Sequence, residues 1–386
     1  MARIVLIASV AQSLLAFRGC LLEDMVAEGH QVLTCAPPTE EQVIKDLRNL
    51  GVDFCPLPMA RNSIDPRGDL QLARRMKQLF EAQKPDLVFS YTIKPVIYGS
   101  LVARWCGIPS AAMITGLGKT FSGISRQDRA VEKIVRLLYR VSLRRANPVF
   151  FQNPDDLQLF WRAGLVKRDN RPTMIPGSGV DLDFFTPRPF PKQPSFLLLA
   201  RMIAAKGIPE YVAAAKILRR KYPFVRIRMA GFITTGSGSI TAQQIEDWQR
   251  DAGVEFLGGL DDVRPALTNT SVYVLPSWYR EGIPRSILEA MAMGRPIITT
   301  DAPGCRETVR PDENGFLVPE RDAEALANAM IKFVEQPELI EKMGTASRLL
   351  AEQRFDVRRV NNIILHRLGL RQSAANPSVR KISSSS

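Results

Sequence analysis

The stretch at residues 275–304 (LPSWYREGIPRSILEAMAMGRPIITTDAPG) constrains the fold of this chain more than any other. It follows an apolar strand, Val272–Leu275, with a polar loop. A helix comes next, with Pro284 at its expected first position and Gly294 just past its end, which is the usual punctuation of a helix. Residues 296–299 then read as a further strand. A unit of strand, loop, helix and strand predicts an α/β protein with a parallel sheet.

Two glutamates in this unit, Glu281 and Glu289, are separated by seven residues. Glu281 lies in the loop, where it can face a ligand. Glu289 lies in an apolar part of the helix, where a carboxylate is costly unless it has a partner. The helix start formed by Gly282, Ile283 and Pro284 favours a phosphate because its N–H groups are unpaired. The alternative is a solvated loop charge and a salt bridge at the helix surface.

The residues around this pair carry a family resemblance. They are Glu281, Glu289, Ala290, Met291, Ala292, Gly294 and Pro296, continued by Gly304, Glu307, Asn314, Gly315 and Leu317. The segment closely resembles the signature of family-four glycosyltransferases, a group of retaining, metal-independent enzymes with the GT-B fold. The resemblance implies two Rossmann-like domains that face each other across a cleft. It also implies that Glu281 holds the donor sugar and Glu289 the ribose.

The length of 386 residues fits two domains rather than one core. The clearest boundary is a short polar stretch that contains Pro187, Pro189, Pro191 and Pro194. We therefore expect an acceptor-binding domain at residues 1–186 and a nucleotide-sugar-binding domain at residues 187–372. The resemblance implies that the last helix crosses back to the first domain. Residues 373–386 are expected to be a disordered tail.

The composition narrows the class of protein and its compartment. A net charge of +13 calls for an anionic partner or surface. Five scattered cysteines without a CxxC pair argue against a disulfide framework or a zinc cage, and favour a reducing compartment. We find no run of about 18 apolar residues that could span a membrane. The N-terminal apolar run could be a short signal peptide, but a first buried strand at Arg3–Ser9 is preferred.

Candidate acceptor-side residues follow two expected strands of the first domain, because functional groups collect beyond such strand ends. They are Lys94, Thr115 and Gly116. Lys94 could equally be an ordinary surface lysine. The sequences TIKPxxYG and TGLGxxF resemble a bacterial subgroup that extends polyprenyl-diphosphate-linked saccharides. Many family-four enzymes have a histidine where this chain has Thr115 and Gly116.

The second domain opens with a strand, Ser195–Ala200, that leads into Arg201 and then Lys206. Two cations before a helix suit a diphosphate, although an incidental surface pair could show the same spacing. The family has an Arg and a Lys at this spacing, which implies that Arg201 and Lys206 are catalytic together with Glu281. Gly231 and Gly259 end the next two strands, where the backbone could contact a nucleobase.

Residues 126–145 carry seven cations and two carboxylates, a net charge of +5, among many apolar residues. A basic amphipathic helix can lie on an anionic membrane. The alternative is a helix packed on the core with a solvated basic face. With a lipid-linked acceptor in view, we favour a peripheral location on the inner face of the cytoplasmic membrane.

The function implied by the resemblance is transfer of a sugar, a hexose or N-acetylhexosamine, from a nucleoside diphosphate sugar, with UDP favoured, to a lipid-linked saccharide. Neither a metal nor another cofactor is expected. Two rivals are a nucleotide-sugar epimerase or hydrolase on the same fold and a non-catalytic nucleotide-sugar-binding protein. Nucleic acid is not an expected partner, because no basic stripe interleaved with stacking aromatic residues is present.

Overall fold

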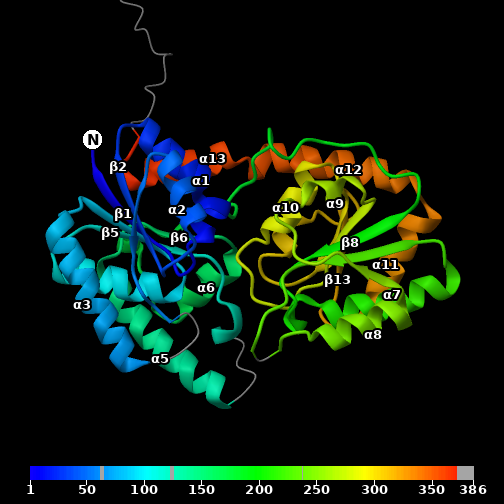
Figure 1. Ribbon diagram of the computed structural model, residues 1–386, viewed down its shortest axis with the longest axis horizontal. Helices are drawn as coiled ribbons and strands as arrows, with labels where there is room; N and C mark the ends of the chain where they lie inside the picture. The colour runs from blue at the N-terminus through cyan, green and yellow to red at the C-terminus, as the bar shows by residue number, and fades with distance from the viewer. Residues whose placement is uncertain (61–64, 122–125, 237, 372–386) are drawn as a thin grey trace, which may run out of the picture.

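Two parallel β-sheets, each flanked by helices, form the two halves of the molecule (Figure 1). The computed structural model describes residues 1–60, 65–121, 126–236 and 238–371. All strand pairs within both sheets are parallel. The predicted α/β class with two Rossmann-like domains is therefore confirmed.

The first sheet has seven strands in the order β3-β2-β1-β4-β5-β6-β7. Its strands are β1 (Arg3–Ile7), β2 (Gln31–Ala36), β3 (Asp53–Pro56), β4 (Leu87–Tyr91), β5 (Ser110–Ile114), β6 (Val149–Phe151) and β7 (Thr173–Met174). Its α-helices are α1 (Gln12–Ala27), α2 (Glu41–Asn49), α3 (Pro66–Gln83), α4 (Ser100–Trp105), α5 (Arg126–Ser142) and α6 (Pro154–Arg162).

The second sheet has six strands in the order β10-β9-β8-β11-β12-β13. Its strands are β8 (Ser195–Leu199), β9 (Arg226–Ala230), β10 (Val254–Phe256), β11 (Val272–Leu275), β12 (Ile297–Thr300) and β13 (Gly315–Val318). The remaining α-helices are α7 (Ile208–Lys221), α8 (Ala242–Ala252), α9 (Arg264–Thr268), α10 (Arg285–Ala292), α11 (Ala323–Glu335), α12 (Glu338–Leu350) and α13 (Val357–Leu368).

Burial explains why the central strands read as continuous apolar runs. Every residue of β4, β5 and β8 is buried, as expected for parallel strands that are covered on both faces. Strand β1 lies between β2 and β4, so the N-terminal apolar run is a central strand, as preferred over a signal peptide. Helix α10 begins at Arg285, one residue later than predicted, with Pro284 at its N-cap.

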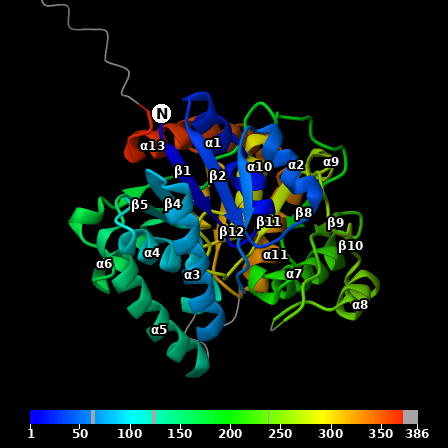
Figure 2. The ribbon, with the colours of Figure 1, turned by 60° about the vertical axis from the view of Figure 1, so that its left-hand side comes forward.

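The last helix, α13, lies against the first half of the molecule, beside α1 (Figures 1 and 2). Its residues Val360, Ile364 and Leu365 belong to the same apolar cluster as β1 and α1. The proposed boundary between residues 186 and 187 falls in the connection between β7 and β8. The predicted tail at residues 373–386 lies outside the described residues.

No α-helix in the described part of the chain is long and apolar enough to cross a lipid bilayer.

Candidate active site

The loop after β8 carries the two predicted phosphate-binding cations. Lys206 ends a short 3₁₀ helix, Ala204–Lys206, and α7 starts two residues later. Gly207 between them has a φ of +76°, and a Cβ there would lie 1.9 Å from the carbonyl oxygen of Pro276. Only glycine therefore allows the loop to pack this closely on the end of β11. Arg201 is exposed and has no ion pair with another described residue.

Lys206 and Glu281, predicted separately from two parts of the sequence, form an ion pair between Nζ and Oε1. Both side chains are largely buried, and Glu281 also accepts a hydrogen bond of 3.2 Å from the Ser277 hydroxyl. The backbone N–H groups of Trp278 and Tyr279 bind the carbonyl of Ala205 and hold the two loops together. A diphosphate that binds Lys206 must compete with Glu281 for its charge.

Glu289 has the partner that its apolar position requires. Its Oε1 accepts a hydrogen bond of 2.9 Å from Nε of Arg285, one helical turn earlier. Burial raises the pKa of Glu289, and the Arg285 charge partly opposes this effect. Arg285 also donates to the carbonyl of Ala16 in α1. The Glu289 pair therefore lies where α10 meets the first domain.

First-domain side chains hold the Glu281 loop in place, and these residues were not among the predicted site residues. Asn153, the N-cap of α6, donates to the carbonyls of Glu281 and Gly282 over 3.0 and 3.3 Å. Asp156 is 1% exposed and accepts a bond of 3.3 Å from Arg280. The sequence Asn-Pro-Asp-Asp directly after a buried strand is an N-cap signal that could have identified them.

The N–H group of Ile283, predicted to face the donor phosphate, is already engaged. It donates a hydrogen bond of 3.2 Å to Oε1 of Gln152, and Gly282 to Pro284 are buried. In this structure the backbone that precedes α10 therefore faces the first domain. Phosphate binding by the Ile283 N–H requires that Gln152 release it.

The acceptor-side candidates Thr115 and Gly116 lie at the same junction. Gly116 has a φ of +105°, and a Cβ there would lie 2.4 Å from the backbone nitrogen of Gly282. Two residues later, the Gly118 N–H donates to the carbonyl of Arg280 over 3.0 Å. The glycines after β5 thus let the two domains meet at the Glu281 loop.

Lys94, the third acceptor-side candidate, forms an ion pair of 2.6 Å with Asp69 of α3, and both side chains are 13% exposed. This pairing within the first domain favours a structural role.

Gly231 and Gly259 lie at neighbouring strand ends of the second sheet. The Gly231 N–H donates to the carbonyl of Gly258 over 2.8 Å. A Cβ on Gly259 would lie 2.4 Å from the ring of Phe232, which is itself exposed. Phe232 is an aromatic surface beside the two glycines, and the sequence did not single it out as a ligand-binding residue.

No group of three or more His, Cys, Asp or Glu side chains in the described residues could hold a metal ion. The polar groups gathered here are instead cations, carboxylates and backbone groups, which suit an anionic, hydroxylated ligand.

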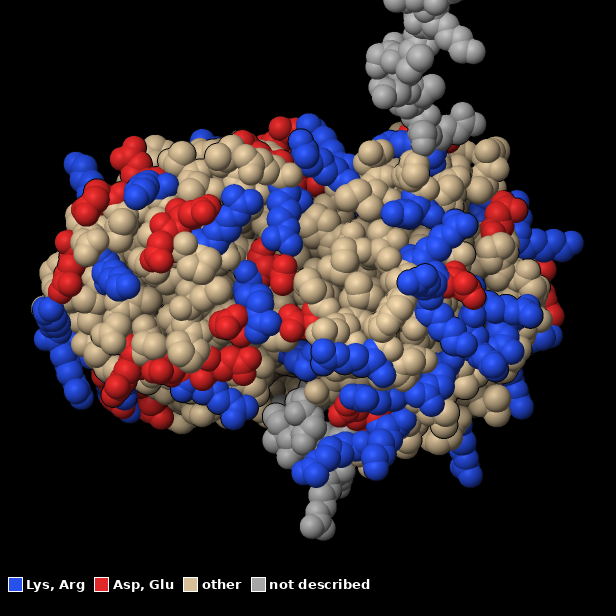
Figure 3. Space-filling view, turned by 180° about the vertical axis from the view of Figure 1, so that it is seen from behind, with Lys and Arg blue, Asp and Glu red and all other residues tan. Residues whose placement is uncertain are grey.

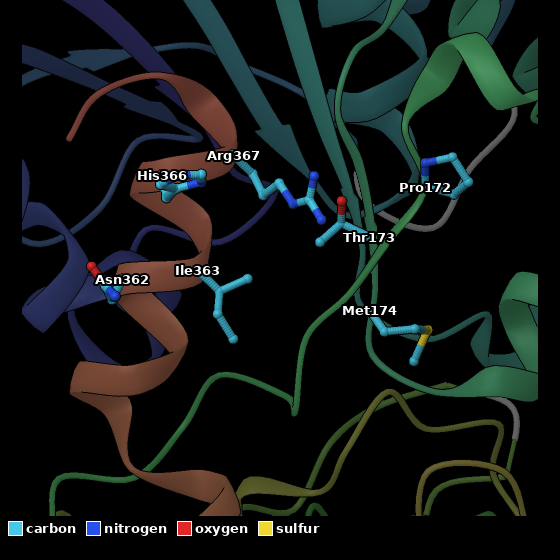
Figure 4. Close-up of a pocket in the computed structure, with 7 residues that line it drawn as sticks. All are labelled: Pro172, Thr173, Met174, Asn362, Ile363, His366 and Arg367. Carbon is cyan, nitrogen blue, oxygen red and sulfur yellow. The ribbon is translucent and has the colours of Figure 1, made fainter. Parts of the chain in front are cut away.

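A hollow of about 560 Å³ lies elsewhere, between β7 and α13 (Figure 4). Arg367 extends toward Thr173 across it, and Ile363 points toward the strand. None of the predicted site residues lines this hollow.

Comparison with known families matches both halves of the chain. Residues 20–177 match the family described as "Glycosyl transferase 4-like domain", and residues 193–336 match "Glycosyl transferases group 1". These two regions contain all of the predicted site residues.

Two relatives of established name are similar over most of the chain. The N,N'-diacetylbacillosaminyl-diphospho-undecaprenol alpha-1,3-N-acetylgalactosaminyltransferase of Campylobacter jejuni is 25% identical over 87% of this chain and 90% of its own. The UDP-Gal:alpha-D-GlcNAc-diphosphoundecaprenol alpha-1,3-galactosyltransferase of Escherichia coli is 24% identical over 69% of this chain and 71% of its own.

Among solved structures, Anabaena HepE in complex with UDP-glucose superposes with a TM-score of 0.78. It is 19% identical, and the match covers 96% of this chain and all of the other. This likeness shows a shared fold.

Proposed function

Because the chain belongs to the family-four, group 1 glycosyltransferases, we propose that it transfers a sugar from a UDP-sugar to a polyprenyl-diphosphate-linked saccharide. The observation that carries the proposal is the Lys206–Glu281 pair, held against the first domain in a chain whose relatives act on undecaprenyl-diphosphate-linked sugars. The product would be an intermediate of surface polysaccharide or glycan synthesis, formed with retention of the anomeric configuration.

Arg201 and Lys206 would stabilise the charge that grows on the departing diphosphate. Preorganised charge of this kind is usually the largest single contribution to catalysis. Arg201 is exposed and open to a ligand, whereas Lys206 becomes available when the donor takes the place of Glu281. Glu281, once released, would bind hydroxyl groups of the donor sugar. This set of charges supports a reaction that needs no divalent metal.

Other predicted residues would bind the nucleoside of the donor. Glu289 would bind the ribose hydroxyls, and the Gly231 and Gly259 backbone would lie beside the base, with Phe232 as a stacking surface. The exposed ring of Phe232 next to Gly259 supports this assignment. Aromatic rings stack on nucleobases without regard to their identity, so the preference for uridine would have to come from backbone contacts.

Helix α5 supports a peripheral location on the membrane that holds such an acceptor. Ile134, Leu137 and Val141 are 47%, 58% and 39% exposed and recur at helical spacing. A basic stripe runs beside them, formed by Arg129, Lys133, Arg136, Arg140 and Arg144. Val135 and Tyr139 of α5 are buried in the core, and Val131 and Leu138 pack against it. Only part of the apolar surface predicted for this helix is therefore available to lipid.

The test is a product screen with purified protein. Each of several UDP-sugars is incubated with and without a polyprenyl-diphospho-N-acetylhexosamine acceptor, and the anomeric configuration of the product is read by NMR. Sugar transfer that depends on the acceptor supports the proposal. Acceptor-independent formation of free sugar or an epimerised nucleotide sugar contradicts it and favours the epimerase or hydrolase alternative.

A further inference from the structure

A basic groove lies between α5, α6 and the loop that precedes Glu281. Its volume is about 410 Å³, and the polar residues that line it are Arg136, Asp155, Gln158, Arg162 and Arg280. Three arginines thus face one carboxylate. On the face of the molecule seen from behind, Lys and Arg side chains gather on the first-domain half (Figure 3).

The charges of the groove are only partly neutralised by protein groups. Asp155 already pairs with Arg306 of the second domain over 3.1 Å, and Arg136 pairs with Glu132 over 2.6 Å. Arg162 forms no ion pair with a described residue. Among the described residues, the side chain of Arg280 makes one hydrogen bond, of 3.3 Å to Asp156, and its Nε is buried without an acceptor.

The Nε of Arg280 is a buried hydrogen-bond donor that has no acceptor among the described residues. A buried donor without an acceptor carries the full free-energy penalty of its desolvation, so such groups are rare in folded proteins. Guanidinium groups bind phosphate oxygens in pairs, through two parallel N–H bonds. A groove with one free and two partly satisfied guanidinium groups therefore suits a ligand that carries more than one phosphate oxygen.

The position of the groove further limits the class of ligand that it could bind. Arg280 directly precedes Glu281, and Asn153 at the start of α6 binds the Glu281 carbonyl. On the other side, α5 carries the exposed apolar residues Ile134, Leu137 and Val141 next to Arg136 and Arg140. Arg140 in turn donates to the carbonyl of Ala163, which lines the groove. Through Arg280 the groove adjoins the proposed sugar-transfer site, and through Arg136 it adjoins α5, the helix with the proposed lipid-facing surface.

We propose that this groove binds the diphosphate of the acceptor lipid, through Arg162, Arg280 and Arg136. The acceptor sugar would extend toward Glu281, and the polyprenyl chain would leave along Ile134, Leu137 and Val141. This assignment rests on the proposed function, since it requires a lipid diphosphate as the acceptor.

The decisive variant is Arg162→Ala, because Arg162 is exposed and its side chain makes no hydrogen bond or ion pair within the described residues. We expect its KM for a polyprenyl-diphospho-sugar to rise at least about tenfold, as for loss of one hydrogen bond to a charged group. The KM for the donor should not change. Arg162→Lys should recover part of the loss, and Gln158→Glu should weaken acceptor binding by repulsion. Arg48→Ala, an exposed arginine of α2, is the matched control that should behave as wild type.

Direct binding separates this subsite from the lipid surface and from the reaction. Wild-type protein should bind farnesyl diphosphate in calorimetry more tightly than Arg162→Ala does. Both should sediment equally with phosphatidylglycerol vesicles. If Arg162→Ala loses vesicle binding but keeps its affinity for farnesyl diphosphate, the groove binds the phosphate groups of bulk lipid, and the assignment is overturned.

The kinetic outcomes separate the subsite from the function itself. If wild type glycosylates the lipid acceptor and Arg162→Ala shows the same acceptor KM, the subsite is wrong and the function stands. If wild type glycosylates no polyprenyl-diphosphate acceptor, the proposed function fails, and the subsite fails with it.

Discussion

The side-chain amide of Asn153 donates a hydrogen bond of 3.0 Å to the backbone carbonyl of Glu281, across the junction of the two domains. The same nitrogen also lies 3.3 Å from the carbonyl of Gly282 and 3.0 Å from Oδ2 of Asp156. One first-domain side chain thus fixes the loop that carries a proposed catalytic residue of the second domain.

Asn153→Ala should lower kcat by about tenfold and the stability by about 1 to 2 kcal/mol, because it removes both a helix cap and the anchor of the loop. Asn170→Ala is the matched control. Asn170 is also buried and binds two backbone carbonyls, those of Leu143 and Ala146, which both belong to the first domain. It should lose stability and keep kcat. Equal kcat values in the two variants would show that Asn153 has only a structural role.

Arg201→Ala and Lys206→Ala should each raise the activation barrier by about 2 to 4 kcal/mol, the range for loss of a preorganised stabilising charge. The effect should appear in kcat rather than in acceptor KM. For Lys206→Ala, Glu281 is left without its partner, so Lys206→Ala combined with Glu281→Gln shows how much of the loss comes from that unpaired carboxylate. Near-normal kcat in folded single variants would disprove the assignment.

Activity should survive treatment with EDTA. The proposed site balances the diphosphate with Arg201 and Lys206, and the described residues contain no cluster of metal ligands. The measurement is the initial rate with EDTA, then with added magnesium or manganese. Loss of activity that either metal restores would contradict the prediction.

The stability of the chain should depend on pH through Asp156. Burial raises the pKa of Asp156 to about 6, while Asn153 and Arg280 partly oppose the rise. The folded state therefore binds this proton more tightly than the unfolded state, whose carboxyl has a pKa of 3.8. The stabilising contribution is complete below that value and is lost as the pH rises through about 6. At about 1.4 kcal/mol per pKa unit, the loss is at most about 3 kcal/mol.

The measurement is urea unfolding of wild type and Asp156→Asn across this pH range. The stability of wild type relative to the variant should fall as the pH rises, and then level off above about 7. Two curves that stay parallel would show that Asp156 titrates as an ordinary carboxyl group.

Membrane binding should depend on the exposed apolar residues of α5. At high salt the charges of α5 are screened, and the apolar contact is what remains. Replacing Ile134, Leu137 and Val141 with Ser should therefore release the protein from anionic vesicles under these conditions. Leu349→Ser is the control, since Leu349 is 52% exposed on α12 of the second domain. Unchanged sedimentation of the triple variant would place the membrane contact elsewhere.

Local sequence patterns predicted the elements, and the family motif predicted which of them carry the site. The strand before Arg201 and the loop before Glu289 could be read locally, and the structure brings Lys206 and Glu281 into contact. The hydrogen bond from Asn153 to the Glu281 carbonyl could not be predicted from the sequence, because the packing of two domains brings together residues that are 128 apart. Lys94 is a second example of this limit, since no local pattern reveals its partner Asp69.

Helix α13 makes the first domain depend on residues that are synthesised long after its own strands. Val360, Ile364 and Leu365 complete a core that begins with Ile4 and Leu6, while the last strand of that sheet, β7, ends at Met174. At roughly 5 to 20 residues per second, the ribosome makes the intervening chain in about 10 to 40 seconds. During that time the second domain can fold, while the first keeps an uncovered apolar surface. The nascent chain should therefore be most vulnerable to aggregation and most attractive to chaperones in this interval.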